Sequence, residues 1–162
     1  MAIFSTFVDI DPLTYNISPE KTEETISSLG KDKVKRIKAL IPVHLYGQCA
    51  AMNSLVNIAQ KYRLKIIEDA AQAHGAEYKG KKCGSLGDIS CFSFYANKII
   101  TSGEGGMLLT NNEALAEKAR AIRNLCFQKG KRFYHEELGY NFRMTNIQAA
   151  IGLAQLERID EL

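Results

Sequence analysis

The stretch from residue 39 to residue 69 limits the possible folds of this chain more than any other, because it alternates apolar strands with one amphipathic helix. Residues 39–45 and 64–67 are apolar runs, and the second run ends in Glu68 and Asp69. Between them, apolar residues recur at helical spacing: Met52, Leu55, Val56, Ile58, Ala59 and Tyr62. A β-α-β unit of this kind joins parallel strands, which predicts an α/β fold.

The N-terminal part carries weaker signals of the same type. Residues 6–10 form a short apolar run that predicts a strand. Ser18 followed by Pro19 is typical of a helix start, and Gly30 is expected to end that helix. The basic cluster that follows predicts a solvated loop and strand edge; it comprises Lys31, Lys33, Lys35, Arg36 and Lys38.

The C-terminal part continues the alternation. Residues 89–94 and 106–109 are strand candidates, and Asn112 is expected to cap a charged helix that ends near residue 123. Residues 129–132 predict an exposed loop. A final helix, beginning near residue 145 or 146, has an apolar face made of Ile147, Ala150, Ile151, Ala154, Leu156 and Ile159. The fold class predicted is therefore α/β, with a mostly parallel sheet flanked by helices.

Composition excludes several classes of function. A net charge of +3 with scattered lysines gives no basic stripe, so no nucleic-acid partner is expected. No stretch approaches the apolar length of a membrane span and no secretory signal is visible, which predicts a cytoplasmic protein. The three histidines and four cysteines show no ligand spacing, so no metal site and no disulfide are expected, and the cysteines are expected to be reduced thiols.

Lys98 and Asp69 are the residues whose placement points most directly to chemistry. A lysine that holds an aldehyde cofactor as a Schiff base must stand at the end of a rigid element, and a carboxylate must keep the cofactor's ring nitrogen protonated. Lys98 follows the strand candidate 89–94, and Asp69 ends an apolar strand. Together they predict a site for pyridoxal 5'-phosphate, although Asp69 alone could merely cap the turn that follows it.

Five segments carry a resemblance to a known family: residues 7–12, 66–76, 87–98, 102–107 and 139–150. The chain resembles the DegT/DnrJ/EryC1/StrS sugar aminotransferases, and within them the GDP-perosamine synthase branch. The resemblance implies the pyridoxal-phosphate-dependent transferase fold, in which an amino group passes from glutamate to a nucleotide-linked 4-keto-6-deoxysugar during polysaccharide or O-antigen biosynthesis. For this branch the implied substrate is GDP-4-keto-6-deoxymannose.

The resemblance also implies roles for individual residues. Lys98 would hold the cofactor and move the proton, and Asp69 would bind the ring nitrogen. Gln72, on the same side of a helical turn as Asp69, would reach the ring hydroxyl oxygen, and Ser93 would donate to the phosphate. Asn141 would reach the phosphate of a partner subunit, which implies a homodimer. The role of His74 stays open, and Arg143 could add positive charge or pair with Glu136 or Glu137.

Family members are roughly twice as long as this chain, so residues 1–162 are expected to be part of the cofactor-binding large domain, without an N-terminal segment and a C-terminal small domain. The competing hypothesis is a truncated, non-catalytic remnant that at most associates with a full-length homologue. A relative that dehydrates its substrate has histidine where this chain has Lys98, so the resemblance implies transamination rather than dehydration.

Overall fold

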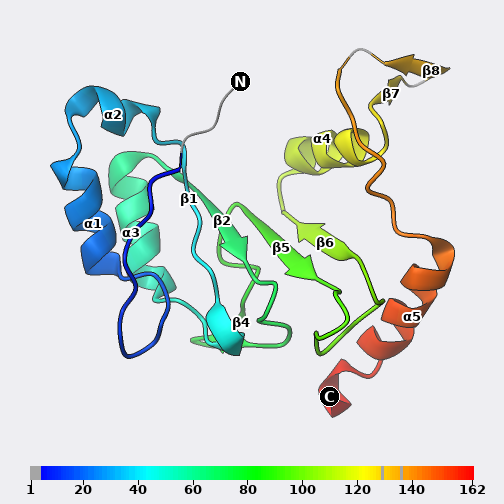
Figure 1. The fold of residues 1–162 in the computed structure, drawn as a ribbon, viewed down its shortest axis with the longest axis horizontal. Helices are drawn as coiled ribbons and strands as arrows, with labels where there is room; N and C mark the ends of the chain where they lie inside the picture. The colour runs from blue at the N-terminus through cyan, green and yellow to red at the C-terminus, as the bar shows by residue number, and fades with distance from the viewer. Residues whose placement is uncertain (1–4, 129, 136) are drawn as a thin grey trace. The chain divides into compact units, whose positions relative to one another are not determined.

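The computed structural model describes residues 5–128, 130–135 and 137–162, and it divides the chain into two compact units (Figure 1). The first unit is Met1–Phe92 and the second is Ser93–Leu162. The boundary falls inside strand β5 (Ile89–Ser93), directly before its last residue.

The first unit contains the expected β-α-β arrangement. Strands β1 (Ala39–Leu40) and β2 (Lys65–Asp69) pair in parallel, and β2 pairs in parallel with β5. Helix α3 (Met52–Tyr62) connects β1 to β2. Leu55, which is fully buried, represents the face of α3 that packs in the core. The prediction of an α/β fold with parallel strands and flanking helices is confirmed.

Strand β1 is shorter than the expected run 39–45. It ends at Leu40, and beyond it only an isolated parallel bridge joins Val43 to Asp69. Pro42 lies between, and a proline has no backbone N–H to give to a ladder. The chain then turns through the short 3-10 helix η1 (Leu45–Gly47).

The N-terminal expectations are partly right. Helix α1 (Pro19–Ser28) begins as predicted, with the Ser18 hydroxyl accepting the Lys21 N–H, and it ends before Gly30. Two expectations are wrong. Residues 6–10 contribute only an isolated bridge between Ile10 and Ile17, and the basic cluster begins with helix α2 (Lys31–Arg36) rather than a loop. Helix α2 is amphipathic enough to pack Val34 against the core.

A tight hairpin between β2 and β5 was not expected from the sequence. It pairs β3 (Glu77–Tyr78) with β4 (Lys81–Lys82) in antiparallel fashion. Lys79 and Gly80 form its turn, and both have positive φ angles, of 51° and 76°. This is the backbone twist that two-residue hairpins favour.

The second unit contains strand β6 (Gly106–Leu109) and helices α4 (Glu113–Arg123) and α5 (Asn146–Leu156), followed by the short η2 (Ile159–Glu161). The predicted strand and the predicted α4, with its Asn112 cap, are confirmed. The final helix begins as predicted but ends at Leu156, so Ile159 of its expected apolar face lies in η2. Thr145 starts α5 with a capping box that includes Gln148. These starts are local in origin, because a capping side chain bonds an amide only a few residues away.

The expected loop at 129–132 is wrong in part. Strands β7 (Phe127–Gln128) and β8 (Lys131–His135) form an antiparallel hairpin there, and Lys129 lies outside the described residues. Among the helices that the structure describes, none combines the length and apolar character needed to cross a membrane. That residues 1–162 form one partial cofactor-binding domain stays a prediction.

Candidate functional site

Both backbone polar groups of Asp69, the last residue of β2, are hydrogen-bonded to the segment around Val43. Its N–H donates to the Pro42 carbonyl and its carbonyl accepts the His44 N–H, each at 2.9 Å. The carboxylate Oδ1 accepts the Ala71 N–H at 3.1 Å, so the capping use considered from the sequence is present. A carboxylate has a second oxygen, and capping is therefore compatible with binding a ligand at this end of the strand.

Gln72 lies three residues further, in a turn rather than on the expected helical turn. Its side-chain Oε1 accepts the N–H of Tyr46, in η1, at 2.8 Å. Because the oxygen is used in this way, the amide NH₂ is the end of Gln72 that can donate to a ligand. Tyr46 itself has a φ of 51°, so the loop that carries it holds a sparsely populated conformation.

Sequence reasoning missed a buried polar pair directly beside Asp69. Glu68 and His44 are both fully buried, and His44 Nε2 lies 2.9 Å from Glu68 Oε2. The other ring nitrogen, Nδ1, accepts the Ala50 N–H at 3.1 Å. An N–H can only donate, so the ring proton is on Nε2 and His44 donates it to the carboxylate as a neutral imidazole.

The Glu68 carboxylate also collects backbone donors from the segment after β4. Oε2 accepts the N–H of Gly84 at 2.8 Å, and Oε1 accepts those of Leu86 and Gly87 at 2.6 and 2.5 Å. Burial alone raises the pKa of Glu68, but the bonds from His44 and these three amides outweigh it and hold the pKa below 4.5, its ordinary value. The carboxylate is therefore charged and fully hydrogen-bonded.

The backbone reaches Glu68 this closely because residue 87 is glycine. A Cβ at Gly87 would stand 2.8 Å from the Ile66 side chain and 3.0 Å from its carbonyl oxygen. The sequence contained a signal for the pair, since Ile66 and Glu68 alternate onto the same face of β2. A glutamate on a core face needs a partner, but nothing local identifies His44, 24 residues away.

We expect Glu68→Gln to lower the free energy of unfolding by about 3 kcal/mol, because it leaves the His44 and Gly84 donors facing an amide NH₂ or unpaired. Urea unfolding measures the change. The pKa of Glu68 is lowered by folding, so its stabilisation is complete above the ordinary pKa of 4.5 and is lost as the pH falls through the folded value. The variant should therefore lose stability less steeply in acid.

Glu77→Gln is the matched control, since Glu77 is exposed and pairs with Lys82 at the surface. It should unfold at nearly the same urea concentration as the unchanged chain. Equal stability of the two variants at neutral pH would contradict a structural role for the buried pair.

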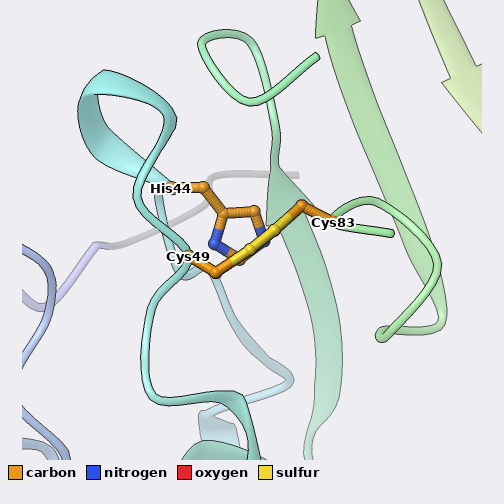
Figure 2. Close-up of side chains that lie close together, drawn as sticks. All are labelled: His44, Cys49 and Cys83. Atoms are coloured by element: carbon orange, nitrogen blue, oxygen red, sulfur yellow. A yellow bond between two sulfur atoms is a disulfide. The ribbon is translucent and has the colours of Figure 1, made fainter. Parts of the chain in front are cut away.

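Cys49 and Cys83 form a disulfide beside His44, and the expectation of four reduced thiols without a disulfide is therefore wrong (Figure 2). The two cysteines stand 34 residues apart, with a Cα–Cα distance of 6.5 Å. Their spacing in the sequence carried no signal, because the hairpin β3–β4 returns Cys83 to the loop that follows η1. Cys91 and Cys126 are free.

His44, Cys49 and Cys83 also form the one cluster of potential metal ligands found among the described residues. One ligand atom each from His44, Cys49 and Cys83 lies within 4.8 Å of the others, a proximity not visible as sequence spacing. Both His44 ring nitrogens are already hydrogen-bonded, and the sulfurs are bonded to each other. In this state the cluster offers no free ligand set, since zinc needs thiolates and an imidazole lone pair.

Lys98 and Ser93 belong to the second unit. Ser93 is the last residue of β5, and its Oγ accepts the Tyr95 N–H at 3.2 Å. A hydroxyl that accepts one bond keeps its own proton for another acceptor, which fits a phosphate oxygen. Lys98, half-buried, lies in the turn that follows, where its N–H donates to the Tyr95 carbonyl at 3.0 Å.

The loop that carries Lys98 is closed at its base. Phe94 accepts the Ser102 N–H at 3.0 Å and the Thr101 hydroxyl at 3.1 Å. Gln155 of α5 binds the Thr101 backbone twice, accepting its N–H at 3.0 Å and donating to its carbonyl at 2.7 Å. Sequence reasoning missed Gln155, which lies 54 residues from Thr101. These hydrogen bonds hold the two ends of the loop, and the role of Lys98 as a Schiff-base lysine stays a prediction.

Two glycines near the end of this loop, Gly103 and Gly105, have backbone conformations that other residues rarely adopt. Gly105 has a φ of 143°, and a Cβ there would stand 2.9 Å from the Ser102 hydroxyl and 3.2 Å from the Met144 side chain. Gly103 has a φ of 78°. Gly103 is thus required for the turn, and Gly105 for the turn and for close packing within the unit.

Asn141 lies before α5, exposed, in an isolated bridge with Asn124. Its Oδ1 accepts the Arg143 Nε–H at 3.2 Å. Of the two acidic partners considered for Arg143, Glu137 pairs with Lys118, and Glu136 lies outside the described residues. Asp69 and Gln72 thus lie in the first unit, whereas Ser93, Lys98 and Asn141 lie in the second.

Comparison with known proteins identifies the type of molecule. The model of the DegT/DnrJ/EryC1/StrS aminotransferase family matches residues 3–162. A GDP-perosamine synthase of Caulobacter vibrioides is 52% identical over 154 residues, which are 95% of this chain and 40% of that protein. A Bacillus subtilis relative, EpsN, is 43% identical over 155 residues (96% of this chain, 40% of that protein) and carries pyridoxal phosphate dependence in its name.

Solved structures agree with these relatives. Helicobacter pylori PseC, an aminotransferase involved in the biosynthesis of pseudoaminic acid, superposes with a TM-score of 0.87 at 33% identity. The match covers 97% of this chain and 41% of that one. The chain spans about 40% of the length of the curated relatives that it matches.

Proposed function

Because the chain belongs to the DegT/DnrJ/EryC1/StrS aminotransferase family, we propose that it is the cofactor-binding part of a pyridoxal-phosphate-dependent sugar aminotransferase. The reaction proposed is transfer of an amino group from glutamate to a nucleotide-linked 4-keto-6-deoxysugar. The observation that carries most weight is the 52% identity to a GDP-perosamine synthase over 95% of this chain. It favours a GDP-linked sugar as the acceptor.

The residues present have the chemistry that pyridoxal phosphate needs. When bound, this cofactor supplies an electron sink for the carbon that gains or loses the amino group. Asp69 would hold the proton at the ring nitrogen, and the amide NH₂ of Gln72 would donate to the ring hydroxyl oxygen. Ser93 would donate its hydroxyl to the phosphate. Lys98 would bind the aldehyde carbon and then move the proton as general acid and base.

We further propose that the complete enzyme is a cytoplasmic homodimer in which Asn141 contributes to the partner's phosphate site. Support comes from apolar side chains that α5 leaves exposed, with Ile147 at 74% and Leu153 at 55% of full exposure. Exposed apolar surface of this kind favours association. No nucleic-acid partner is proposed, since the net charge is only +3.

A chimaera tests the function in a complete protein. Residues 3–162 would replace the corresponding segment of the Caulobacter synthase, to which the chain is 52% identical over 154 residues. We expect glutamate-dependent amination of GDP-4-keto-6-deoxymannose, and none of a UDP-linked 3-keto sugar offered as control. Mass spectrometry of the sugar nucleotide measures the product.

Two other outcomes have distinct meanings. A chimaera that aminates only the UDP-linked control would place the protein on another branch of the family. A folded chimaera that binds no pyridoxal phosphate would contradict the proposed function and support the non-catalytic remnant. Absorption in the visible range reports cofactor binding separately from turnover.

A further inference from the structure

The disulfide between Cys49 and Cys83 ties together two loops of the first unit that are remote in sequence (Figure 2). Cys49 lies just after η1, and Cys83 lies just after β4. Neither cysteine belongs to the residues proposed to bind pyridoxal phosphate. Their place beside the buried His44 connects the bond to the polar pair that adjoins Asp69.

The two sulfurs differ in their access to solvent. Cys49 is half-buried, whereas Cys83 is only 4% exposed and packs in a small apolar cluster with Ala70 and Ala73. The greater exposure of Cys49 makes its sulfur the one that a dissolved thiol is expected to attack. Access decides which sulfur is attacked in thiol–disulfide exchange, and this favours attack on Cys49.

Each cysteine is followed directly by a residue whose amide serves the buried pair. Ala50 donates its N–H to His44 Nδ1, and Gly84 donates its N–H to Glu68 Oε2. The loop before Cys49 also carries Tyr46, whose N–H binds Gln72. The disulfide thus restrains the two loops whose Ala50 and Gly84 amides bind the His44–Glu68 pair. It also restrains the segment of Tyr46, whose amide binds Gln72.

We propose that Cys49 and Cys83 form a reversible thiol–disulfide exchange site, whose state controls how firmly the loops around His44 and Glu68 are ordered. Exchange is independent of the proposed function. Only its consequence, looser support for Asp69 and Gln72 in the reduced chain, rests on that function.

The reaction balances with a small thiol such as glutathione. Its thiolate attacks Cys49 Sγ, the Cys49–Cys83 bond breaks, and Cys83 leaves as a thiolate that takes up a proton. A second glutathione thiolate then attacks the glutathione sulfur of the mixed disulfide and releases Cys49. The chain gains two electrons and two protons, and two glutathione molecules become one oxidised glutathione.

A zinc site made of the same residues is the competing interpretation, and the hydrogen bonds of His44 argue against it. Its Nδ1 accepts from Ala50 and its Nε2 donates to Glu68, so binding a metal would break one of two buried hydrogen bonds. The cluster also supplies two thiolates only after reduction. We therefore make zinc binding an outcome of the test.

Alkylation with iodoacetamide and mass spectrometry tests the bond in the 162-residue chain. Denatured without reductant, the oxidised chain should take up two labels, on the free Cys91 and Cys126, and after reduction four. Equilibration with mixtures of reduced and oxidised glutathione should move the chain between these states. Cys49→Ser should abolish the transition, whereas the matched control Cys91→Ser combined with Cys126→Ser should retain it.

Hydrogen exchange tests whether the disulfide controls the order of the loops. It uses the unchanged chain, because a substitution could unfold the protein and obscure the result. Reduction should speed exchange of the Tyr46, Ala50 and Gly84 amides by about tenfold or more. The Leu115 and Gln148 amides, which bind the capping side chains of α4 and α5, are internal controls and should not change.

Four results would contradict the proposal. Four labels without reductant would show that no bond forms, and a bond that survives every glutathione ratio would be a static crosslink. Reduced chain that retains one equivalent of added zinc through gel filtration would assign the cysteines to a metal site. Unchanged exchange of the Tyr46, Ala50 and Gly84 amides would show that the disulfide does not control the order of these loops.

Discussion

Lys98→Ala, made in the chimaera, should remove all covalent attachment of pyridoxal phosphate and abolish amination of the sugar nucleotide. In the proposed function Lys98 would supply the amine that binds the aldehyde carbon, and alanine has neither an amine nor a group that can move the proton. Borohydride reduction followed by peptide mass spectrometry should find the pyridoxyl group on Lys98 in the unchanged protein and nowhere in the variant. Activity should fall below detection.

Lys33→Ala is the control for this substitution, since Lys33 lies exposed on α2. It should keep both the label and the activity. Recovery of the pyridoxyl group on Lys79 or Lys129 would assign the attachment to a different lysine and contradict the role of Lys98. The backbone of the Lys98 loop should tolerate alanine, because Phe94, Thr101 and Gln155 close its base.

Asp69→Asn should slow the half-reaction with glutamate by about a thousandfold or more, while cofactor binding falls much less. Asparagine keeps an oxygen that can accept the Ala71 N–H, so the local turn survives. In the proposed function it would lose the negative charge that keeps the ring nitrogen protonated, so the barrier to breaking the carbon–hydrogen bond would rise. Each increase of about 1.4 kcal/mol in that barrier slows the reaction tenfold. Stopped-flow absorption with glutamate measures the single turnover.

Asp11→Asn is a matched control, because the Asp11 Oδ1 also accepts a nearby backbone N–H, that of Leu13. Its rate with glutamate should equal that of the unchanged protein. A near-normal single-turnover rate in Asp69→Asn would refute the proposed role of the carboxylate and leave Asp69 as a capping residue.

The sequence alone was sufficient for elements whose cause is local. Helix α3 follows from the helical period of its apolar residues and strand β2 from a continuous apolar run. The starts of α1, α4 and α5 follow from capping side chains a few positions away. The candidates Lys98 and Asp69 were found in the same way, from their place after apolar strands. Their roles stay predictions.

Features that depend on contacts between distant residues were decided only by the tertiary structure. His44 meets Glu68 across 24 residues, Gln155 meets Thr101 across 54, and Cys49 bonds Cys83 across 34. No sequence periodicity predicts these contacts, because they depend on which loops the parallel strands and the β3–β4 hairpin bring together. The sequence therefore determined the β-α-β framework and its candidate residues, and packing alone decided the buried pair and the disulfide that support them.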